Sequence, residues 1–194
     1  MISDTTTDPA QKIFGIGLSK TGTTSLARAL HKLGYPTKDF PSIIYKPHRL
    51  VGLNEEQLHH YTAFTDISVV PFYKELDKRF PNAKFIYTIR DKKEWLASCA
   101  HYPRFNRSVF SLPLNIIKLR QEIYGTVKFD EEKFAAAYEK HHKDVMKHFK
   151  DRPTDLLVLN ICEGQKWQPL CQFLQEPQPE EQFPFANVRV NGHA

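Results

Sequence analysis

Cysteine is scarce in this chain, and its few copies lack the spacing that disulfide frameworks and zinc sites require. There are three cysteines among 194 residues, an odd number with no C-x-x-C pair. Small disulfide scaffolds and cysteine-based metal sites carry more cysteines, in recognisable pairs. We therefore expect Cys99, Cys162 and Cys171 to be reduced thiols, and we expect a cytoplasmic protein.

Long apolar runs and long basic runs are also missing. No stretch is long enough to span a membrane, and residues 1–11 are polar without the apolar core of a signal peptide. The formal net charge of +5 fits an anionic ligand, but the chain lacks a basic stripe with interleaved aromatic residues. We therefore expect neither a membrane nor a nucleic acid as a partner.

The histidines do not form a metal-binding pattern. His59-His60 and His141-His142 are adjacent pairs, whose members point to different sides of a helix, and no H-E-x-x-H motif is present. We interpret them as surface residues and expect no metal ion.

The apolar residues that are present predict strands alternating with helices. Apolar residues make up 41% of the chain and charged residues 25%, an ordinary globular composition. Buried strands are predicted at 12–16, 61–66, 84–89 and 155–161, with a short one at 35–39. Helices are predicted at 26–33, 71–80, 93–100, 114–124, 130–149 and 169–174, and residues 40–58 read as a loop with a short helix near 55–60. The alternation predicts an α/β fold of three layers, with a mostly parallel central sheet and flanking helices, in one domain over residues 12–194 after a disordered lead-in at 1–11.

A loop rich in glycine, serine and threonine lies between the first strand and the first helix. Gly22 lets the backbone approach an anion, Lys20 adds a positive charge, and Thr23, Thr24 and Ser25 add hydroxyl donors at the helix start. The pattern predicts a site for a phosphate or sulfate ester. It differs from the nucleoside-triphosphate loop G-x-x-x-x-G-K-[ST], because Thr23 stands where that motif has its lysine.

Two further groups follow predicted strands, where ligands of parallel sheets bind. Arg90 follows the strand at 84–89, and Ser98 lies on the next helix, so a guanidinium fork and a hydroxyl are both available to a phosphate. A surface ion pair of Arg90 with Asp91 or Glu94 is the alternative. Asp66 ends the strand at 61–66 and is either a general base or a structural carboxylate.

Three segments together resemble the sulfotransferases that use 3′-phosphoadenosine 5′-phosphosulfate (PAPS). Lys20-Thr21-Gly22-Thr23-Thr24 resembles their 5′-phosphosulfate loop, and Arg90 with Ser98 resembles their R-x7-S element, which holds the 3′-phosphate. Phe64-Thr65-Asp66 is similar, more weakly, to K-T-H, whose histidine is the general base in cytosolic members. The resemblance implies the P-loop NTPase-like sulfotransferase architecture, closest to compact bacterial sulfotransferase-like proteins.

The resemblance also implies roles for single residues. Lys20 and Asp66 would be catalytic, with His101 as the next candidate base. The PAPS-binding residues would be Lys20, Thr21, Gly22, Thr23, Thr24, Ser25, Arg90 and Ser98. PAPS would serve as co-substrate without a metal, and the acceptor would be a hydroxyl or amine of a small molecule or glycan. From the aromatic and basic residues of 102–129 we expect this segment, together with 40–58, to line the acceptor site in part; hydrophobic cover of the core is the alternative.

The chain departs from the family pattern at two places. Cytosolic members have a tryptophan after the T-T pair that stacks on adenine, where this chain has Ser25, and an R-K-G segment near the C-terminus, which is not found here. Two alternatives therefore stay open: a P-loop kinase or NTPase, which would need a lysine at Thr23, and a PAPS-binding protein without catalytic activity.

Overall fold

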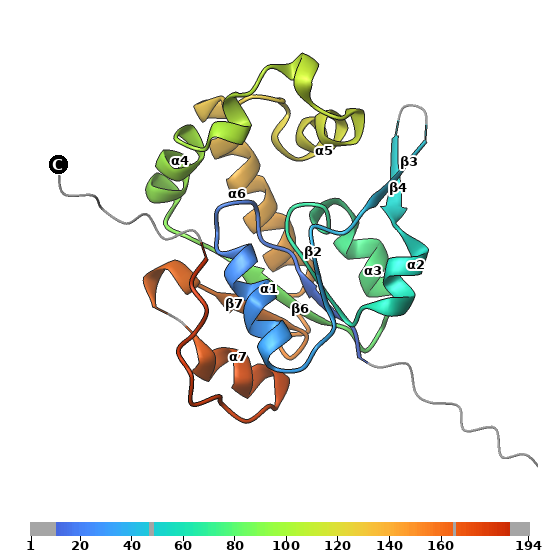
Figure 1. Ribbon diagram of the computed structural model, residues 1–194, viewed down its shortest axis with the longest axis vertical. Helices are drawn as coiled ribbons and strands as arrows, with labels where there is room; N and C mark the ends of the chain where they lie inside the picture. The colour runs from blue at the N-terminus through green and yellow to red at the C-terminus, as the bar shows by residue number, and fades with distance from the viewer. Residues whose placement is uncertain (1–10, 47–48, 165, 187–194) are drawn as a thin grey trace, which may run out of the picture.

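A five-stranded sheet forms the centre of the computed structural model, which describes residues 11–46, 49–164 and 166–186 (Figure 1). Its strands are β1 (Ile13–Gly15), β2 (Thr37–Asp39), β5 (Ala63–Thr65), β6 (Lys84–Thr88) and β7 (Leu156–Leu159). They lie in the order β2-β5-β1-β6-β7, and every neighbouring pair is parallel. All five carboxyl ends therefore meet at one edge of the sheet.

Helices cover both faces of this sheet. The α-helices of the described residues are α1 (Thr23–Lys32), α2 (Glu55–His60), α3 (Tyr73–Arg79), α4 (Lys92–Ala100), α5 (Leu114–Tyr124), α6 (Glu131–His148) and α7 (Trp167–Leu174), and those on the two faces are α1 with α7 and α3 with α6. Successive side chains of a strand point to opposite faces, so Ile13 and Ile86 pack with α1 and α7, whereas Phe14 and Phe85 pack with α3 and α6. This three-layer α/β arrangement confirms the predicted fold class.

A third apolar cluster lies where α4, α5 and α6 meet, apart from the two faces of the sheet. Trp95, Tyr124 and Phe134 are fully buried there, and the rings of Tyr124 and Phe134 stack with centroids 4.1 Å apart. Leu18, from the loop after β1, belongs to the same cluster. The cluster therefore joins that loop to the helices that stand beyond the sheet edge.

The prediction of a loop over residues 40–54 was wrong in its main feature. Strands β3 (Ile43–Lys46) and β4 (Arg49–Leu53) form an antiparallel hairpin, which is followed by the expected short helix α2. The register shifts between Ile44 and Tyr45, which breaks the regular alternation that a sequence search relies on. Ile43 and Leu50 pack against two of the apolar clusters, so tertiary contacts stabilise a hairpin that the local pattern does not reveal.

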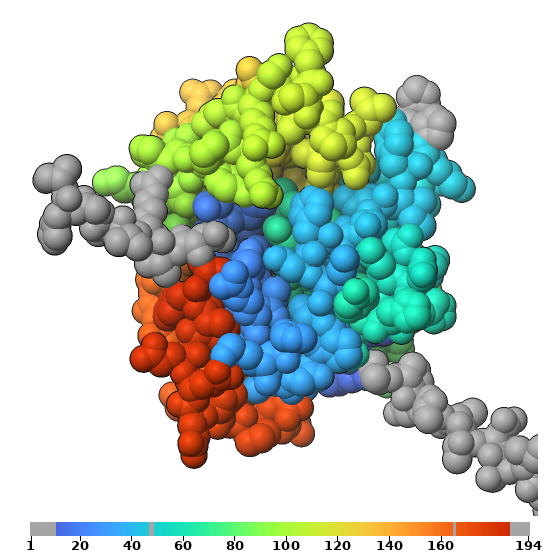
Figure 2. All heavy atoms as spheres, in the orientation of Figure 1, coloured from blue at the N-terminus to red at the C-terminus, as the bar shows by residue number. Residues whose placement is uncertain are grey.

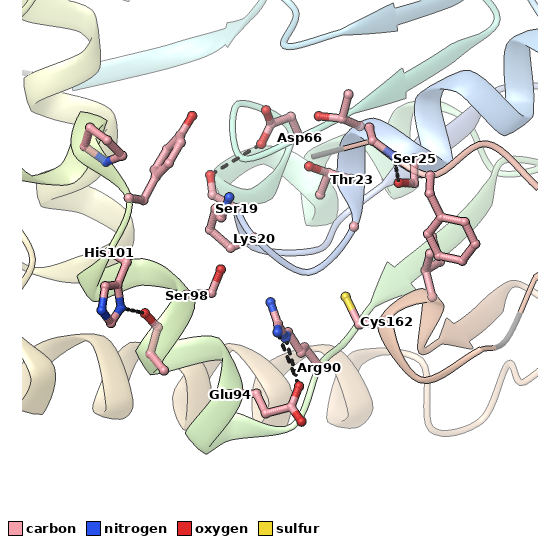
Figure 3. Close-up of a pocket in the computed structure, with 18 residues that line it drawn as sticks. Ser19, Lys20, Thr23, Ser25, Asp66, Arg90, Glu94, Ser98, His101 and Cys162 are labelled. Atoms are coloured by element: carbon pink, nitrogen blue, oxygen red, sulfur yellow. Dashed lines mark hydrogen bonds and ion pairs between the residues drawn. The ribbon is translucent and has the colours of Figure 1, made fainter. Parts of the chain in front are cut away.

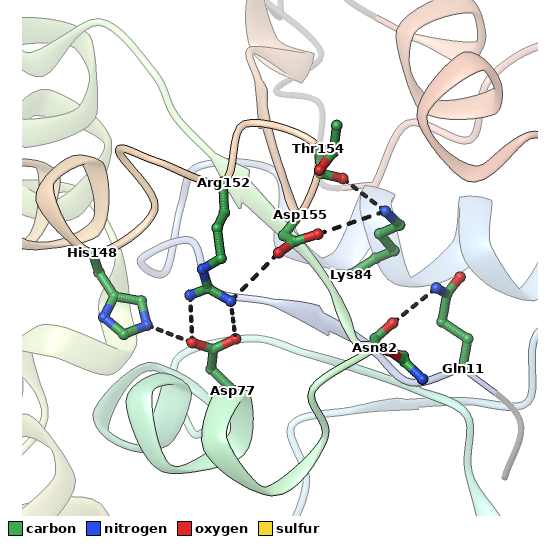
Figure 4. A network of polar contacts seen from close by, with 8 residues as sticks. All are labelled: Gln11, Asp77, Asn82, Lys84, His148, Arg152, Thr154 and Asp155. Carbon is green, nitrogen blue, oxygen red and sulfur yellow. Dashed lines mark hydrogen bonds and ion pairs between the residues drawn. The ribbon is translucent and has the colours of Figure 1, made fainter.

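The predicted lead-in and domain extent are only partly covered. Residues 1–10 and 187–194 lie outside the described residues, so the disorder expected at 1–11 and the single domain over 12–194 stay predictions. Gln11, the last residue of that lead-in, is described, and its side-chain amide donates to the carbonyl oxygen of Asn82 at 2.8 Å (Figure 4).

Candidate functional site

Close packing against β6 and α4 holds the loop between β1 and α1 in a fixed shape. A Cβ atom at Gly17 would lie 1.9 Å from Thr88 Oγ1, so only glycine fits against the end of β6. The Thr21 hydroxyl donates to the Leu18 carbonyl oxygen at 2.7 Å and lies 2.7 Å from Thr88 Oγ1. The Trp95 indole donates to the Ser19 carbonyl oxygen at 2.8 Å. These contacts fix the loop against β6 and α4 and direct the first turn of α1 outward.

A cavity of about 810 Å³ opens at the carboxyl edge of the sheet, above this loop. Figure 2 shows the blue atoms of the early chain recessed beneath the green and yellow-green segment. The loop and α1 supply part of the lining, the end of β6 with α4 another part, and the C-terminal third a further part. The residues with a predicted role that line the cavity are Lys20, Gly22, Thr23, Thr24, Ser25, Asp66, Arg90, Ser98 and His101.

The start of α1 has the features of an anion site. Its N-cap is Gly22, at φ +100°, and no side chain within the described residues caps the first turn, which also lacks acidic residues. The helix dipole and the N–H groups of this turn therefore favour an anion in the cavity. Lys20 has a left-handed backbone, φ +74°, which is strained for lysine, and its Nζ lies 4.4 Å from the centroid of the Tyr102 ring.

Thr21 is the one predicted PAPS-binding residue whose side chain the structure turns away from the cavity. It is 1% exposed, and its hydroxyl is engaged by Leu18 and Thr88. Thr21 thus supports the loop from inside, because its hydroxyl bonds to the loop's own backbone at Leu18 and to Thr88 at the end of β6. Ser25 does line the cavity, and its Oγ accepts a hydrogen bond of 2.9 Å from the backbone N–H of Ala186.

Arg90 and Ser98 lie across the cavity from the loop (Figure 3). Asp91 caps α4 by accepting from the Glu94 N–H at 2.9 Å, and the Tyr138 hydroxyl donates to the Arg90 carbonyl oxygen. These bonds fix the turn between β6 and α4. Arg90 Nε and Nη2 each lie 3.3 Å from Glu94 Oε2, so Arg90 lines the cavity and also forms the ion pair that was the alternative prediction.

Asp66 follows β5 directly and lies at the loop side of the cavity. Its Oδ1 accepts from the Ile67 N–H at 2.6 Å and from the Ser19 hydroxyl at 3.4 Å, and its φ of +82° is unusual for aspartate. Burial raises the pKa of Asp66 to about 6, with a further upward contribution from Asp39, while these hydrogen bonds act in the opposite direction. A carboxyl group with such a pKa is suited to accept a proton near neutral pH.

His101 reaches the same cavity from the end of α4. Its Nδ1 lies 2.7 Å from the carbonyl oxygen of Ala97, in the last turn of the helix, and its ring is exposed. Both candidate bases therefore border one cavity, together with Lys20.

The comparison with protein families agrees with this arrangement. A family model described as a sulfotransferase domain matches residues 12–191. The chain belongs to the sulfotransferase family. It is 27% identical to the "Ava biosynthesis cluster protein M" of Aspergillus versicolor, over 93% of this chain and 84% of that protein. The printed name of that relative states no reaction, so the family assignment depends on the domain match.

Some lining residues of this sulfotransferase-family protein were missed by sequence reasoning. They come from the C-terminal third of the chain: Ile161, Cys162, Phe185 and Ala186. Ile161 and Cys162 follow the end of β7, so the strand-end rule that found Asp66 and Arg90 would have found them too. No sequence signal marked Phe185 and Ala186, because they belong to an irregular segment that runs along α1.

The predicted acceptor-lining segments contribute less than expected. Tyr102 and Pro103 line the cavity, whereas Phe105, Leu119 and Tyr124 are buried in the third apolar cluster and Phe110 and Leu114 are exposed away from it. None of the described residues of 40–58 lines it, because the hairpin packs against the core instead. The prediction of acceptor contacts from 40–58 is thus not supported by this cavity.

The described residues of this sulfotransferase-family protein contain neither a candidate metal cluster nor a candidate membrane-spanning helix. Among residues 11–46, 49–164 and 166–186, no three His, Cys, Asp or Glu side chains group closely enough to hold a metal ion. Within those ranges, every helix is too short or too polar to cross a membrane.

Proposed function

We propose that this protein transfers a sulfuryl group from PAPS to a hydroxyl or amine acceptor. The observation that carries the proposal is that two separate groups of potential anion donors line one cavity. The first is the Lys20 loop with the start of α1, and the second is Arg90 with Ser98. PAPS carries its phosphosulfate and its 3′-phosphate at separate positions, so the donor groups match its two charged ends.

The donor set fits this nucleotide better than a nucleoside triphosphate. Thr23 occupies the position at which a triphosphate loop needs lysine to reach the β- and γ-phosphates. Lys20 instead extends from the middle of the loop, beside Tyr102. A guanidinium with a neighbouring hydroxyl suits a dianionic monoester such as a 3′-phosphate.

Lys20 and Asp66, which both lie at the loop side of the cavity, would act on the two bonds that change. A new bond forms from the acceptor oxygen or nitrogen to sulfur while the bond from sulfur to the phosphate oxygen breaks. Lys20 stabilises the negative charge that develops on that phosphate oxygen, as a fixed cation in a partly buried site can. Asp66, ionised above pH 6, accepts the proton that the acceptor loses.

The acceptor is proposed to enter beside Tyr102, Pro103 and His101, where the cavity has aromatic and apolar walls. A small molecule or a glycan with a free hydroxyl or amine suits such walls, and we do not expect a nucleic acid or membrane partner. All three cysteines are free thiols, which supports our inference of a cytoplasmic location.

Titration calorimetry with adenosine 3′,5′-bisphosphate, the nucleotide product, tests the proposal. We expect saturable binding of this nucleotide and an increase in the melting temperature, because a ligand of the native state raises apparent stability. ATP with Mg²⁺ is the comparison ligand. Binding of ATP with Mg²⁺ and not of the bisphosphate would reject the proposal and support a kinase. Binding followed by transfer from labelled PAPS to a panel of phenols, sugars and amines would establish the enzyme.

A further inference from the structure

We propose that the C-terminal segment Glu181–Ala186 is a strap that holds the nucleoside base of the bound nucleotide, with Phe185 as the side chain that stacks on it. The inference rests on the proposed function, since it assigns the base end of the same cavity. It concerns a planar purine base as ligand, recognised by an aromatic ring and neutral neighbours.

The first part of the strap is firmly attached to the α1 and α7 face. The Trp167 indole donates to the Glu181 carbonyl oxygen at 2.8 Å, and Lys32 at the end of α1 pairs with the Glu181 carboxylate. Phe183 is 5% exposed and meets the Trp167 ring at a centroid distance of 4.9 Å. In Figure 1 the red segment rises from α7 beside α1 toward the start of that helix.

The last part of the strap is placed against the phosphate loop by a single described hydrogen bond. The Ala186 N–H donates to Ser25 Oγ at 2.9 Å, and Ser25 is 3% exposed in the first turn of α1. This bond brings Phe185 next to the turn that carries Thr23 and Thr24. The base of a nucleotide whose phosphates lie on that turn is then within reach of the Phe185 ring.

Phe185 remains accessible although it lies at the cavity. Its side chain is 44% exposed, and it lines both the 810 Å³ cavity and a second cavity of about 860 Å³ behind the strap. Lys166 Nζ lies 4.9 Å from the ring centroid, and the Phe183 ring meets the Phe185 ring at 66° with centroids 6.1 Å apart. An exposed aromatic ring gains from stacking on a base, because both surfaces lose contact with water.

The neighbours of Phe185 in the cavity complete a site for an uncharged planar group. Ile161 is 1% exposed, Cys162 carries a neutral thiol whose pKa is raised by burial, and Ala186 is small. The charged groups that line the cavity belong to other elements: Lys20 to the loop, Asp66 to the end of β5, and Arg90 and Glu94 to the turn and helix after β6. Ile161, Phe185 and Ala186 therefore form an apolar end of the lining, and Cys162 lies between this end and Arg90 (Figure 3).

The test compares two ligands on two variants by titration calorimetry. The ligands are adenosine 3′,5′-bisphosphate and 1-deoxyribose 3,5-bisphosphate, which has both phosphates and no base. Phe185→Ala should weaken the adenosine compound by about 5- to 100-fold, the range expected for one stacked base, and leave the abasic compound unchanged. Phe185→Trp should keep or improve the affinity for the adenosine compound. Phe110→Ala is the matched control, since Phe110 is fully exposed and lies outside the cavity.

Each outcome decides between the two proposals. If the wild type does not bind adenosine 3′,5′-bisphosphate, the proposed function is wrong and the strap has no base to hold. If the wild type binds it and Phe185→Ala binds it equally well, the strap proposal alone is overturned. Equal weakening of both ligands would also overturn it, because Phe185 would then support the loop instead of the base. The melting temperatures of the ligand-free variants verify that they fold. If Phe185→Ala does not fold, the same binding test is made on Phe185→Leu and judged by the same outcomes.

Discussion

Lys20 is the residue at which binding and catalysis should separate most clearly. If its charge mainly stabilises the phosphate oxygen as the bond to sulfur breaks, it contributes more to the transition state than to the bound ground state. Lys20→Ala should therefore lower kcat by much more than it lowers the affinity for adenosine 3′,5′-bisphosphate. Steady-state kinetics and calorimetry on the same preparation measure the two effects. Equal losses would show that Lys20 only binds the nucleotide.

Asp66 should give the reaction an acidic limb near pH 6. Burial raises its pKa to about 6, and the base must be ionised, so kcat/KM should fall as the pH decreases through that value. Asp66→Asn should remove most of the turnover with a hydroxyl acceptor and leave nucleotide affinity nearly unchanged. Asparagine tolerates the left-handed backbone at this position, φ +82°, so the loop geometry should be retained.

His101→Gln is the comparison that assigns the base between the two candidates. Retention of full activity in Asp66→Asn, with loss in His101→Gln, would place the base at the end of α4. Loss in Asp66→Asn alone would place it at the end of β5.

Glu94 is expected to weaken nucleotide binding in the wild-type protein. Its carboxylate pairs with Arg90 at 3.3 Å inside the cavity, and its negative charge repels a phosphate. Glu94→Gln should therefore tighten adenosine 3′,5′-bisphosphate about two- to fivefold, because an exposed ion pair contributes at most about 1 kcal/mol. Glu139→Gln is the matched control, since Glu139 pairs with Lys92 outside the cavity lining. Weaker binding in Glu94→Gln would instead mean that Glu94 orients Arg90 for the phosphate.

At the scale of elements, the turn between β6 and α4, with the helix that follows it, should bind the 3′-phosphate of the nucleotide. Arg90→Ala removes a donor from this turn, and Ser98→Ala removes one from helix α4, which follows the turn. Loss of a hydrogen bond to a charged group costs about 1.5–3 kcal/mol, which is roughly tenfold or more in affinity. Adenosine 5′-phosphosulfate lacks the 3′-phosphate, so its affinity should change little in both variants. Equal losses for the two ligands would show that the turn supports the fold and does not recognise the 3′-phosphate.

The strands and helices of the sheet were predictable because each has a regular local pattern. The run at 84–89 is β-branched and aromatic, and Asp130 and the glutamates after it mark the start of α6. The hairpin at 43–53 was not predictable, because its register shift breaks the alternation and its stability comes from packing of Ile43 and Leu50 on distant helices. The β7 end was recognised as a strand but not as part of the site.

The lining of the cavity was predictable where a charged residue follows a strand, directly as at Asp66 and Arg90 or in the loop after it as at Lys20. It was not predictable where the side-chain direction decides the role. Thr21 and Thr23 are both threonines of one loop, yet only Thr23 lines the cavity, because Thr21 bonds to Thr88 on β6. Phe185 belongs to no recognisable motif, and its position depends on the segment that follows α7 and runs along α1.

At the scale of the whole molecule, the cavity and the main ion-pair network lie at opposite edges of the sheet. Asp77 on α3 binds Arg152 through two bonds of 2.9 and 2.6 Å and His148 Nε2 at 2.8 Å (Figure 4). Asp155, which precedes β7, continues the network to Arg152 and to Lys84 at the start of β6. The network thus joins α3, the end of α6 and the amino ends of β6 and β7. The residues proposed to bind the nucleotide lie past the carboxyl ends of the strands.

This separation predicts that stability and nucleotide binding can be changed independently. The Arg152 guanidinium, and then His148, hold the pKa of Asp77 below its ordinary value although burial acts the other way. Because the pKa of Asp77 is lower in the folded protein than in the unfolded chain, its ionised form stabilises the fold. This stabilisation is fully present above about pH 4, the pKa of an aspartate in the unfolded chain, and is lost as the pH falls through the pKa of Asp77 in the folded protein. Asp77→Asn should therefore lower the free energy of unfolding at pH 7 by about 1–3 kcal/mol, since Asp77 is buried and Arg152 is partly exposed.

Urea denaturation at pH 7 and at pH 3 measures this effect, and the difference between wild type and Asp77→Asn should shrink at the lower pH. Asp144→Asn is the matched control, because Asp144 on α6 forms an exposed pair with Lys140 and should change stability by about 0.5 kcal/mol or less. The affinity of Asp77→Asn for adenosine 3′,5′-bisphosphate at pH 7 should equal that of the wild type. A parallel loss of affinity would show that the amino-end network positions the loop through β6, so that the two edges of the sheet are coupled.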